Sequence, residues 1–185
     1  MKRVIGYLLV NCYWLGRVRQ KHGHSLIQLL THSLIVILFL ACQSDGVFKD
    51  HEDIEDGMWY IKNQPAFTFD IKDASQAYNL HYLVRNGVAY PYYNLYLKRY
   101  LLDDKNKVVS EALNELILMD EKTGRPLGDG AGDLFDHKII ALKNYKFPKV
   151  GKYTFKIQQY MRQDPLPMIL SVGVSVEPIS PQNKE

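Results

Sequence analysis

The residue with the clearest chemical assignment is Cys42, at the end of an apolar stretch near the N-terminus. The chain there is Phe39-Leu40-Ala41-Cys42, and polar residues follow at once in 43–46. An apolar residue, a small residue and then a cysteine form the pattern of a lipobox, whose thiol accepts diacylglycerol when the leader is removed, although Phe39 replaces the usual leucine. We therefore predict that the mature chain begins at Cys42 and is held at a membrane by lipid. The alternative is a buried helix with an incidental cysteine.

The segment before Cys42 has the composition of a signal peptide. Arg17, Arg19 and Lys21 form a positive region ahead of an unbroken apolar run at 34–41, which is only 8 residues long. A membrane-spanning helix needs about 20 apolar residues. Residues 1–41 are therefore predicted to be a leader that is cleaved off. Residues 1–25 are either an extension from a start codon assigned too far upstream or a genuine long n-region.

Removing the leader changes both the charge and the cysteine content. The full chain has 23 basic and 20 acidic residues, a formal charge of +3. The leader holds five of the basic residues and no acidic one, so the remainder has 18 against 20 and a charge of −2. A nucleic-acid partner is therefore not expected, because phosphate binding needs a basic face. Since the other cysteine, Cys12, lies in the leader, no internal disulfide can form and the core must stabilise the fold.

One strand-like segment carries the strongest candidate binding surface. Its alternate residues are polar or tyrosine, and they are Tyr92, Asn94, Tyr96, Lys98 and Tyr100. Tyrosine combines an apolar ring with a polar hydroxyl, which favours it at protein interfaces and allows it to stack on sugars. Three interpretations follow: a surface for a protein partner, a glycan-binding surface, or a strand with both faces buried and its hydroxyls satisfied internally.

A glycine-rich loop at 128–136 carries three carboxylates, Asp129, Asp133 and Asp136. Several hard oxygens on a flexible backbone suit Ca²⁺, although the spacing differs from that of an EF-hand. A plain loop between two strands is the favoured interpretation. Apart from this Ca²⁺ and the covalent lipid, no cofactor is expected.

The mature chain shows no recognisable catalytic motif. Its histidines, His51, His81 and His137, are far apart and have no local partner at metal-ligand spacing. A nucleophile elbow and a phosphate loop are both missing from the sequence. We therefore predict a protein that is not an enzyme. A hydrolase acting on cell-wall or polysaccharide substrates stays an alternative, because a pair of Asp or Glu side chains can meet in the fold alone.

The dominant hydrophobic period after Trp59 is two, which is typical of half-buried antiparallel strands. The segments with this period are 67–71, 78–85, 92–100, 152–161 and 170–177, with weaker ones at 113–119 and 138–142. They predict an all-β domain at 58–178, an antiparallel β-sandwich of about seven to eight strands, with a barrel as the second choice. Residues 42–57 are predicted to be a flexible tether and 179–185 a frayed tail.

The order and spacing of short motifs over residues 43–177 resemble the gliding-motility lipoprotein GldH family of the Bacteroidetes. The motifs are Val47-Phe48, Trp59, Phe69-Asp70, Tyr78-Asn79-Leu80, Leu83-Val84-Arg85-Asn86, Tyr92-Tyr93-Asn94-Leu95-Tyr96-Leu97, Leu127-Gly128-Asp129-Gly130, Gly151-Lys152-Tyr153, Ile157-Gln158-Gln159, Met161-Arg162 and Val172-Gly173-Val174. The resemblance implies a lipid-anchored cell-envelope protein, a component or accessory of a motility or secretion assembly. It implies protein partners and no catalytic residues. We expect the outer membrane and its periplasmic side.

The lipid assignment predicts a modified cysteine at the mature N-terminus. Mass spectrometry of the protein from isolated inner and outer membranes should find Cys42 as the first residue, carrying the two or three acyl chains that firm anchoring requires. The Cys42→Ala variant should be released or mislocalised. If that variant stays membrane-bound with an uncleaved leader, the assignment is wrong.

Overall fold

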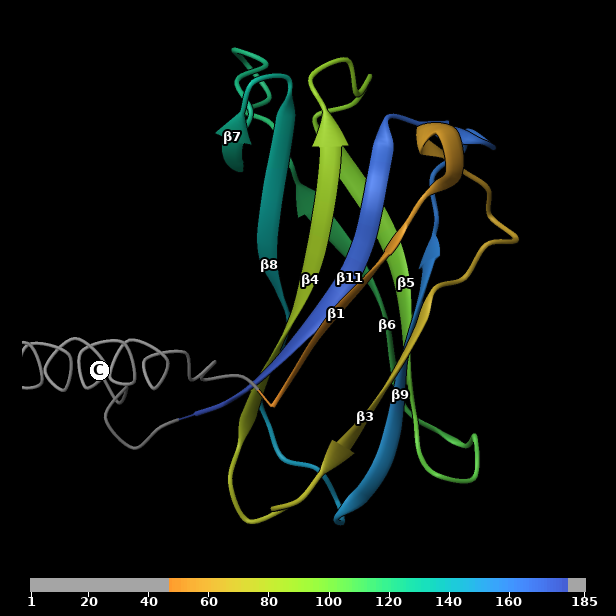
Figure 1. The fold of residues 1–185 in the computed structure, drawn as a ribbon, viewed down its shortest axis with the longest axis vertical. Helices are drawn as coiled ribbons and strands as arrows, with labels where there is room; N and C mark the ends of the chain where they lie inside the picture. The colour runs from red at the N-terminus through yellow and green to blue at the C-terminus, as the bar shows by residue number, and fades with distance from the viewer. Residues whose placement is uncertain (1–46, 180–185) are drawn as a thin grey trace, which may run out of the picture. The chain divides into compact units, whose positions relative to one another are not determined.

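A computed structural model describes residues 47–179, and these residues are almost entirely β-strand (Figure 1). Eight strands have six residues or more, and a single 3₁₀ turn, η1 (Glu55–Gly57), interrupts them. Within this range the prediction of an all-β antiparallel sandwich with seven to eight strands is confirmed. The described residues contain no helix with the length and apolar character needed to cross a membrane. The leader at 1–41, Cys42 and the tail from 180 lie outside them and stay predictions.

Two antiparallel sheets make up the domain. The first sheet has the order β1 (Phe48–Asp53), β11 (Ile169–Pro178), β4 (Tyr78–Gly87), β8 (Leu134–Tyr145) and β7 (Asp129–Ala131). The second sheet has the order β3 (Ala66–Ile71), β9 (Gly151–Gln159), β5 (Asn94–Leu102) and β6 (Val108–Ile117). A small separate pair joins β2 (Met58–Trp59) to β10 (Leu166–Pro167).

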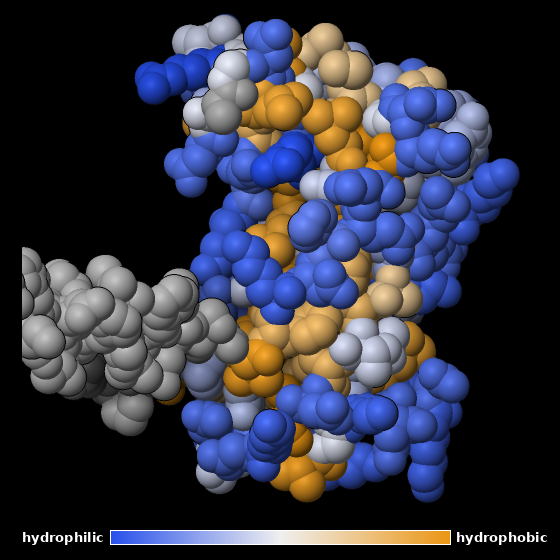
Figure 2. Space-filling view, in the orientation of Figure 1, coloured by the Kyte–Doolittle hydropathy of each residue, from blue (hydrophilic) through white to orange (hydrophobic). Residues whose placement is uncertain are grey.

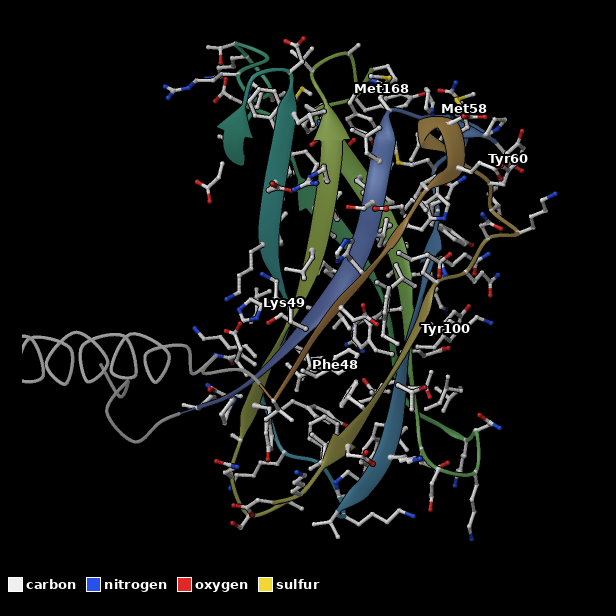
Figure 3. All side chains as sticks on the ribbon, in the orientation of Figure 1. Phe48, Lys49, Met58, Tyr60, Tyr100 and Met168 are labelled. Atoms are coloured by element: carbon white, nitrogen blue, oxygen red, sulfur yellow. The ribbon has the colours of Figure 1, made fainter. Side chains whose placement is uncertain are left out.

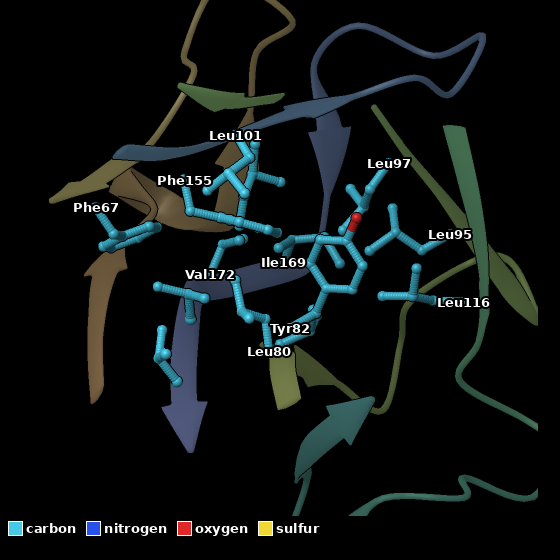
Figure 4. Close-up of a cluster of buried hydrophobic side chains, with 14 of the residues drawn as sticks. Phe67, Leu80, Tyr82, Leu95, Leu97, Leu101, Leu116, Phe155, Ile169 and Val172 are labelled. Atoms are coloured by element: carbon cyan, nitrogen blue, oxygen red, sulfur yellow. The ribbon is translucent and has the colours of Figure 1, made fainter. Parts of the chain in front are cut away.

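The core fills the space between the two sheets with every second residue of the central strands. In β9 the interior residues Tyr153, Phe155 and Ile157 are completely buried, and the alternating residues are not. The rings of Tyr82 and Phe155 meet across the sheets edge to face, with centroids 5.7 Å apart (Figure 4). This geometry adds to the hydrophobic contribution of burial. The period-two pattern of the sequence thus arises because alternate residues of each strand are buried between the two sheets.

The predicted tether is wrong over residues 48–57, because the ordered domain begins earlier. Strand β1 pairs with β11 over its full length, from Phe48 opposite Val176 to Asp53 opposite Ser171. Phe48 packs against the ring of Phe69 with centroids 5.6 Å apart. The other side chains of β1 are exposed, as is usual on an edge strand that is held by its backbone. Because these residues are polar, the sequence of β1 resembles that of a flexible linker, which explains the wrong prediction.

The sandwich is less closed along the side where β6 and β8 lie. The interior-facing residues Ser110, Ala112 and Asn114 of β6 are half-exposed, and so is Ile139 of β8. The interior residues of β9 and β11 are fully buried by comparison. The layer between the sheets is therefore partly exposed to solvent along these two strands.

The core packing predicts that alanine substitutions at neighbouring positions of β9 change the free energy of unfolding by very different amounts. Phe155→Ala should lower the free energy of unfolding by about 3–5 kcal/mol, because it removes a fully buried ring and leaves a cavity. Lys156→Ala, one residue further on the half-exposed face, should change it by less than about 0.5 kcal/mol. Urea unfolding of both variants measures this. Equal effects would show that the interior face has been assigned wrongly.

Candidate functional site

The outer face of β5 presents the residues singled out from the sequence. Asn94, Tyr96, Lys98 and Tyr100 are half-exposed, whereas the residues between them are buried. Tyr100 lies on the second sheet, as Figure 3 shows. The alternative in which both faces of this strand are buried is therefore wrong.

Tyr92 does not share this face. It precedes β5, and its ring packs against the core beside Tyr90, with centroids 5.8 Å apart. Its hydroxyl donates a hydrogen bond to Oε1 of Gln163 at 2.7 Å. The alternation of polar and tyrosine residues in the sequence starts at Tyr92, but the strand itself begins only at Asn94. The predicted face is therefore wrong at this one position.

Cross-strand contacts with β6 hold the polar side chains of the β5 face. Asn94 Nδ2 donates to Oε1 of Glu115 at 2.6 Å, and Lys98 Nζ lies 3.7 Å from Oε1 of Glu111. A hydrogen bond to the Glu115 carboxylate raises the pKa of Tyr96. Ion pairs at such an exposed site contribute little to stability, at most about 1 kcal/mol each. These contacts instead hold the side chains of Asn94 and Lys98 in defined positions. Polar groups in fixed positions are suited to binding a partner.

The three carboxylates of the glycine-rich loop do not form one cluster. Asp129 lies opposite Asp136 in the β7–β8 hairpin, and Asp133 accepts a hydrogen bond from the Val88 N–H through its backbone carbonyl, at 2.8 Å. The guanidinium of Arg85 holds Asp136 with two bonds of 2.8 and 2.9 Å, which lower the pKa of that carboxyl. Over residues 47–179, no group of three or more His, Cys, Asp or Glu side chains is placed to hold a metal ion.

A shallow hollow of about 380 Å³ lies on the outer face of the first sheet. Many hydrophilic side chains cover this face in Figure 2. The residues lining the hollow include Lys49, His51, Arg85, Asp129, Asp136 and Lys138. A glycosidase needs one carboxyl group kept protonated, whereas the pairing with Arg85 keeps Asp136 ionised. This hollow could not be predicted from the sequence, because its residues come from separate strands.

His137 is a buried histidine next to the glycine-rich loop. Its Nε2 lies 2.8 Å from Oδ1 of Asn86, and both side chains are buried. A Cβ at Gly128 would approach Cε1 of His137 to 2.8 Å, so the absence of a side chain there lets the loop backbone lie on the imidazole. Burial lowers the pKa of His137. The buried environment thus favours the neutral form of the imidazole.

Comparison with known proteins identifies one family across the domain. The GldH lipoprotein family matches residues 46–176. A protein of Christiangramia forsetii, named gliding motility lipoprotein GldH homolog, is 33% identical over 129 residues, which cover 70% of this chain and 77% of the relative. The gliding motility lipoprotein GldH of Flavobacterium johnsoniae is 25% identical over 151 residues, covering 78% of this chain and 92% of the relative.

Solved structures show only loose likeness to the fold. An α-L-arabinofuranosidase matches with a TM-score of 0.34 at 11% identity, covering 66% of this chain and 18% of that enzyme. The VP2 subviral particle of infectious bursal disease virus matches with a TM-score of 0.35 at 15% identity, covering 74% of this chain and 31% of VP2. Likeness at this level carries no argument about function.

The buried His137 predicts a loss of stability in acid. Its pKa in the folded state lies below the ordinary value of 6.5, so the unfolded chain takes up a proton first as the pH falls. The free energy of unfolding should therefore decrease below about pH 6.5, by at most about 1.4 kcal/mol per pH unit for one group. Urea titrations between pH 8 and pH 5 measure this slope.

The matched variants for this measurement are His137→Gln and His51→Gln. His137→Gln should reduce the pH dependence, since it removes the buried proton acceptor. His51→Gln, on the exposed β1, should retain the slope of the unsubstituted protein. An unchanged slope in His137→Gln would assign the acid sensitivity to another group.

Proposed function

The chain belongs to the GldH lipoprotein family, and on this premise we propose that it is a non-enzymatic component or accessory of an envelope motility or secretion assembly. The observation that carries the proposal is the family match over almost the whole β-domain, together with relatives that are named gliding motility lipoproteins. In this role the domain binds protein partners, and its lipid keeps it at the membrane.

The proposed anchor is Cys42, and the proposed location is the periplasmic side of the outer membrane. Only residues 43–46 separate Cys42 from the first described residue, Val47. Four residues span at most about 14 Å when fully extended. A domain attached in this way stays close to the lipid headgroups, so its partners would be membrane proteins or proteins that lie along the membrane.

The proposed partner-binding surface is the outer face of β5, made by Asn94, Tyr96, Lys98 and Tyr100. These residues combine half-exposed tyrosine rings with a fixed set of donors and acceptors, which is the composition that protein interfaces favour. A catalytic role has weaker support, since Asp136 in the hollow of the first sheet is paired with Arg85.

A glycan ligand is the second candidate for the β5 face. The half-exposed rings of Tyr96 and Tyr100 favour it, because sugars stack on aromatic faces. The ammonium group of Lys98 lies 5.4 Å from the centre of the Tyr100 ring, however, and so already occupies one approach to that ring. We therefore place the protein partner first.

Substitution of both tyrosines tests the proposed surface. Chemical cross-linking of the full-length protein in native membranes should capture a partner protein, and the double variant Tyr96→Ala/Tyr100→Ala should reduce the cross-linked yield at least tenfold. The control His51→Ala lies on the exposed β1 and should leave the yield unchanged. The melting temperatures of all variants should agree within a few degrees, because the substituted side chains lie outside the core.

Other outcomes separate the candidates. Recovery of the monomer alone at native abundance contradicts the proposed assembly role. If the protein instead binds polysaccharide in titrations and the double variant does not, the glycan candidate replaces the protein partner.

A further inference from the structure

Arg99 is a cation inside the sandwich without a matching anion. It lies on the interior face of β5 between Leu97 and Leu101 and is only 6% exposed. Its Nη1 donates to the hydroxyl of Ser110 at 3.0 Å, and its Nε has no hydrogen-bond partner. Within the described domain, no Asp or Glu forms an ion pair with it. A buried charge without a counter-ion destabilises a protein, so this arrangement is incomplete in isolation.

Small residues of the neighbouring strand β6 separate the buried guanidinium from the open side of the sandwich. Arg99 lies opposite Ala112 in the β5–β6 register, and Leu101 lies opposite Ser110. Both of these β6 residues are small, and both are half-exposed although they face the interior. The bond to Ser110 shows that the guanidinium points from β5 toward β6, the edge strand on the open side of the sandwich. A carboxylate that arrives beside β6 would therefore reach Arg99 without entering the core.

Strand β6 is also the least protected edge of the described domain. It has ten residues and contains no Lys, Arg, Pro or Gly. Strands β1 and β3 are shorter edges, with six residues each. Strand β7 covers only residues 134–136 of β8, so residues 137–145 of β8 are also an edge of the described domain, and they carry Lys138 and Lys143. Charged residues fill β1, and Pro65 precedes β3. Proteins use short length, lysine and proline to prevent unwanted pairing at a sheet edge, and β6 has none of these three features. Its charged residues are Glu111 and Glu115, and a register shift lies only at its start, near Val108.

The backbone of β6 offers free hydrogen-bonding groups at its centre. The Leu118 N–H donates to the carbonyl of Tyr93 at 2.8 Å, directly beyond the last pair of the β5–β6 ladder. Because such a ladder alternates, the N–H and C=O groups of Glu111, Leu113 and Glu115 point away from β5. In the described part of the chain, no other strand pairs with β6.

We propose that β6 is an attachment edge for an extended segment of a partner protein, which adds a fifth strand to the second sheet and places an aspartate or glutamate against Arg99. The free backbone groups of β6 would supply affinity, and the requirement of Arg99 for an acid would supply specificity. This inference rests on the proposed function and extends it. It specifies where the partner protein binds, at β6, and which kind of residue it contributes, an aspartate or glutamate.

A second copy of this chain fits the edge less well than a foreign segment. The interior-facing residues of β6 are uncharged around Arg99, so a paired copy of β6 brings no carboxylate to it. Antiparallel pairing of two copies would also bring Glu111 and Glu115 of each copy near those of the other, and facing like charges are unfavourable. The acid must therefore come from a different sequence.

Photo-cross-linking from the edge of β6 tests the proposal in the full-length protein in native membranes. With p-benzoylphenylalanine at Leu113, which is exposed, the cross-linked peptide should be a partner segment that contains Asp or Glu. Arg99→Met should lower the yield at least tenfold. Its melting temperature should be unchanged or higher, since replacing an unpaired buried charge by an apolar chain of similar volume is often stabilising.

Proline at the free edge provides a second test that does not involve the buried charge. Glu111→Pro removes an N–H that points away from β5 and should abolish the cross-link from Leu113 while the domain stays folded. Thr68→Pro is the matched control on β3, at the opposite edge of the same sheet. The Ile157 N–H donates to the Pro65 carbonyl there, so the same alternation directs the Thr68 N–H outward. This control should retain the cross-link.

Four outcomes overturn the inference. An unchanged yield with Arg99→Met and a lower melting temperature would assign Arg99 a purely structural role. Capture of a second copy of this chain would make β6 a self-association edge. A partner that is cross-linked from Tyr96 but never from Leu113 would leave the proposed function in place and remove β6 from it, whereas the absence of any partner at both positions would contradict both.

Discussion

The structure depends on the hydrophobic layer between its two sheets, where alternate residues of the central strands meet. Since residues 47–179 contain no cysteine, no disulfide joins these strands to one another and this layer stabilises them by burial. Tyr82, Phe155 and Val172 are fully buried in it and come from strands that are distant in sequence. Since these side chains fix which face of each strand points inward, they also fix which residues are left for recognition outside.

The period of two made the long strands and the outer face of β5 predictable from the sequence. What it could not show was β1, because an edge strand is held by backbone bonds and its side chains remain as polar as those of a linker. The start of β5 was placed too early, since Tyr92 continues the alternation but turns its ring to the core. Polar alternation alone does not mark where a strand begins or ends.

Contacts between residues that are distant in the chain could not be predicted from the sequence. The pair of Asn86 with His137 and the pair of Arg85 with Asp136 both span 51 positions of the chain. Arg99 looked like one more residue of an alternating strand, yet it lies at a position where leucine precedes and follows it on the same face. Its burial without a counter-ion becomes visible only when the register of β5, β6 and the opposite sheet is known.

The short β1 gives the domain a particular mechanical property. If Cys42 carries the proposed lipid, a pull from it would act on the N-terminal end of a strand that is paired along its whole length. When such a force runs along β1, the six residue pairs with β11 carry it together, since ladder bonds lie perpendicular to the strand. Shear loading of this kind resists rupture better than opening the pairs one after another. Strand β6 lies at the edge of the other sheet, so a load between the lipid and a partner bound there would pass through the whole hydrophobic layer.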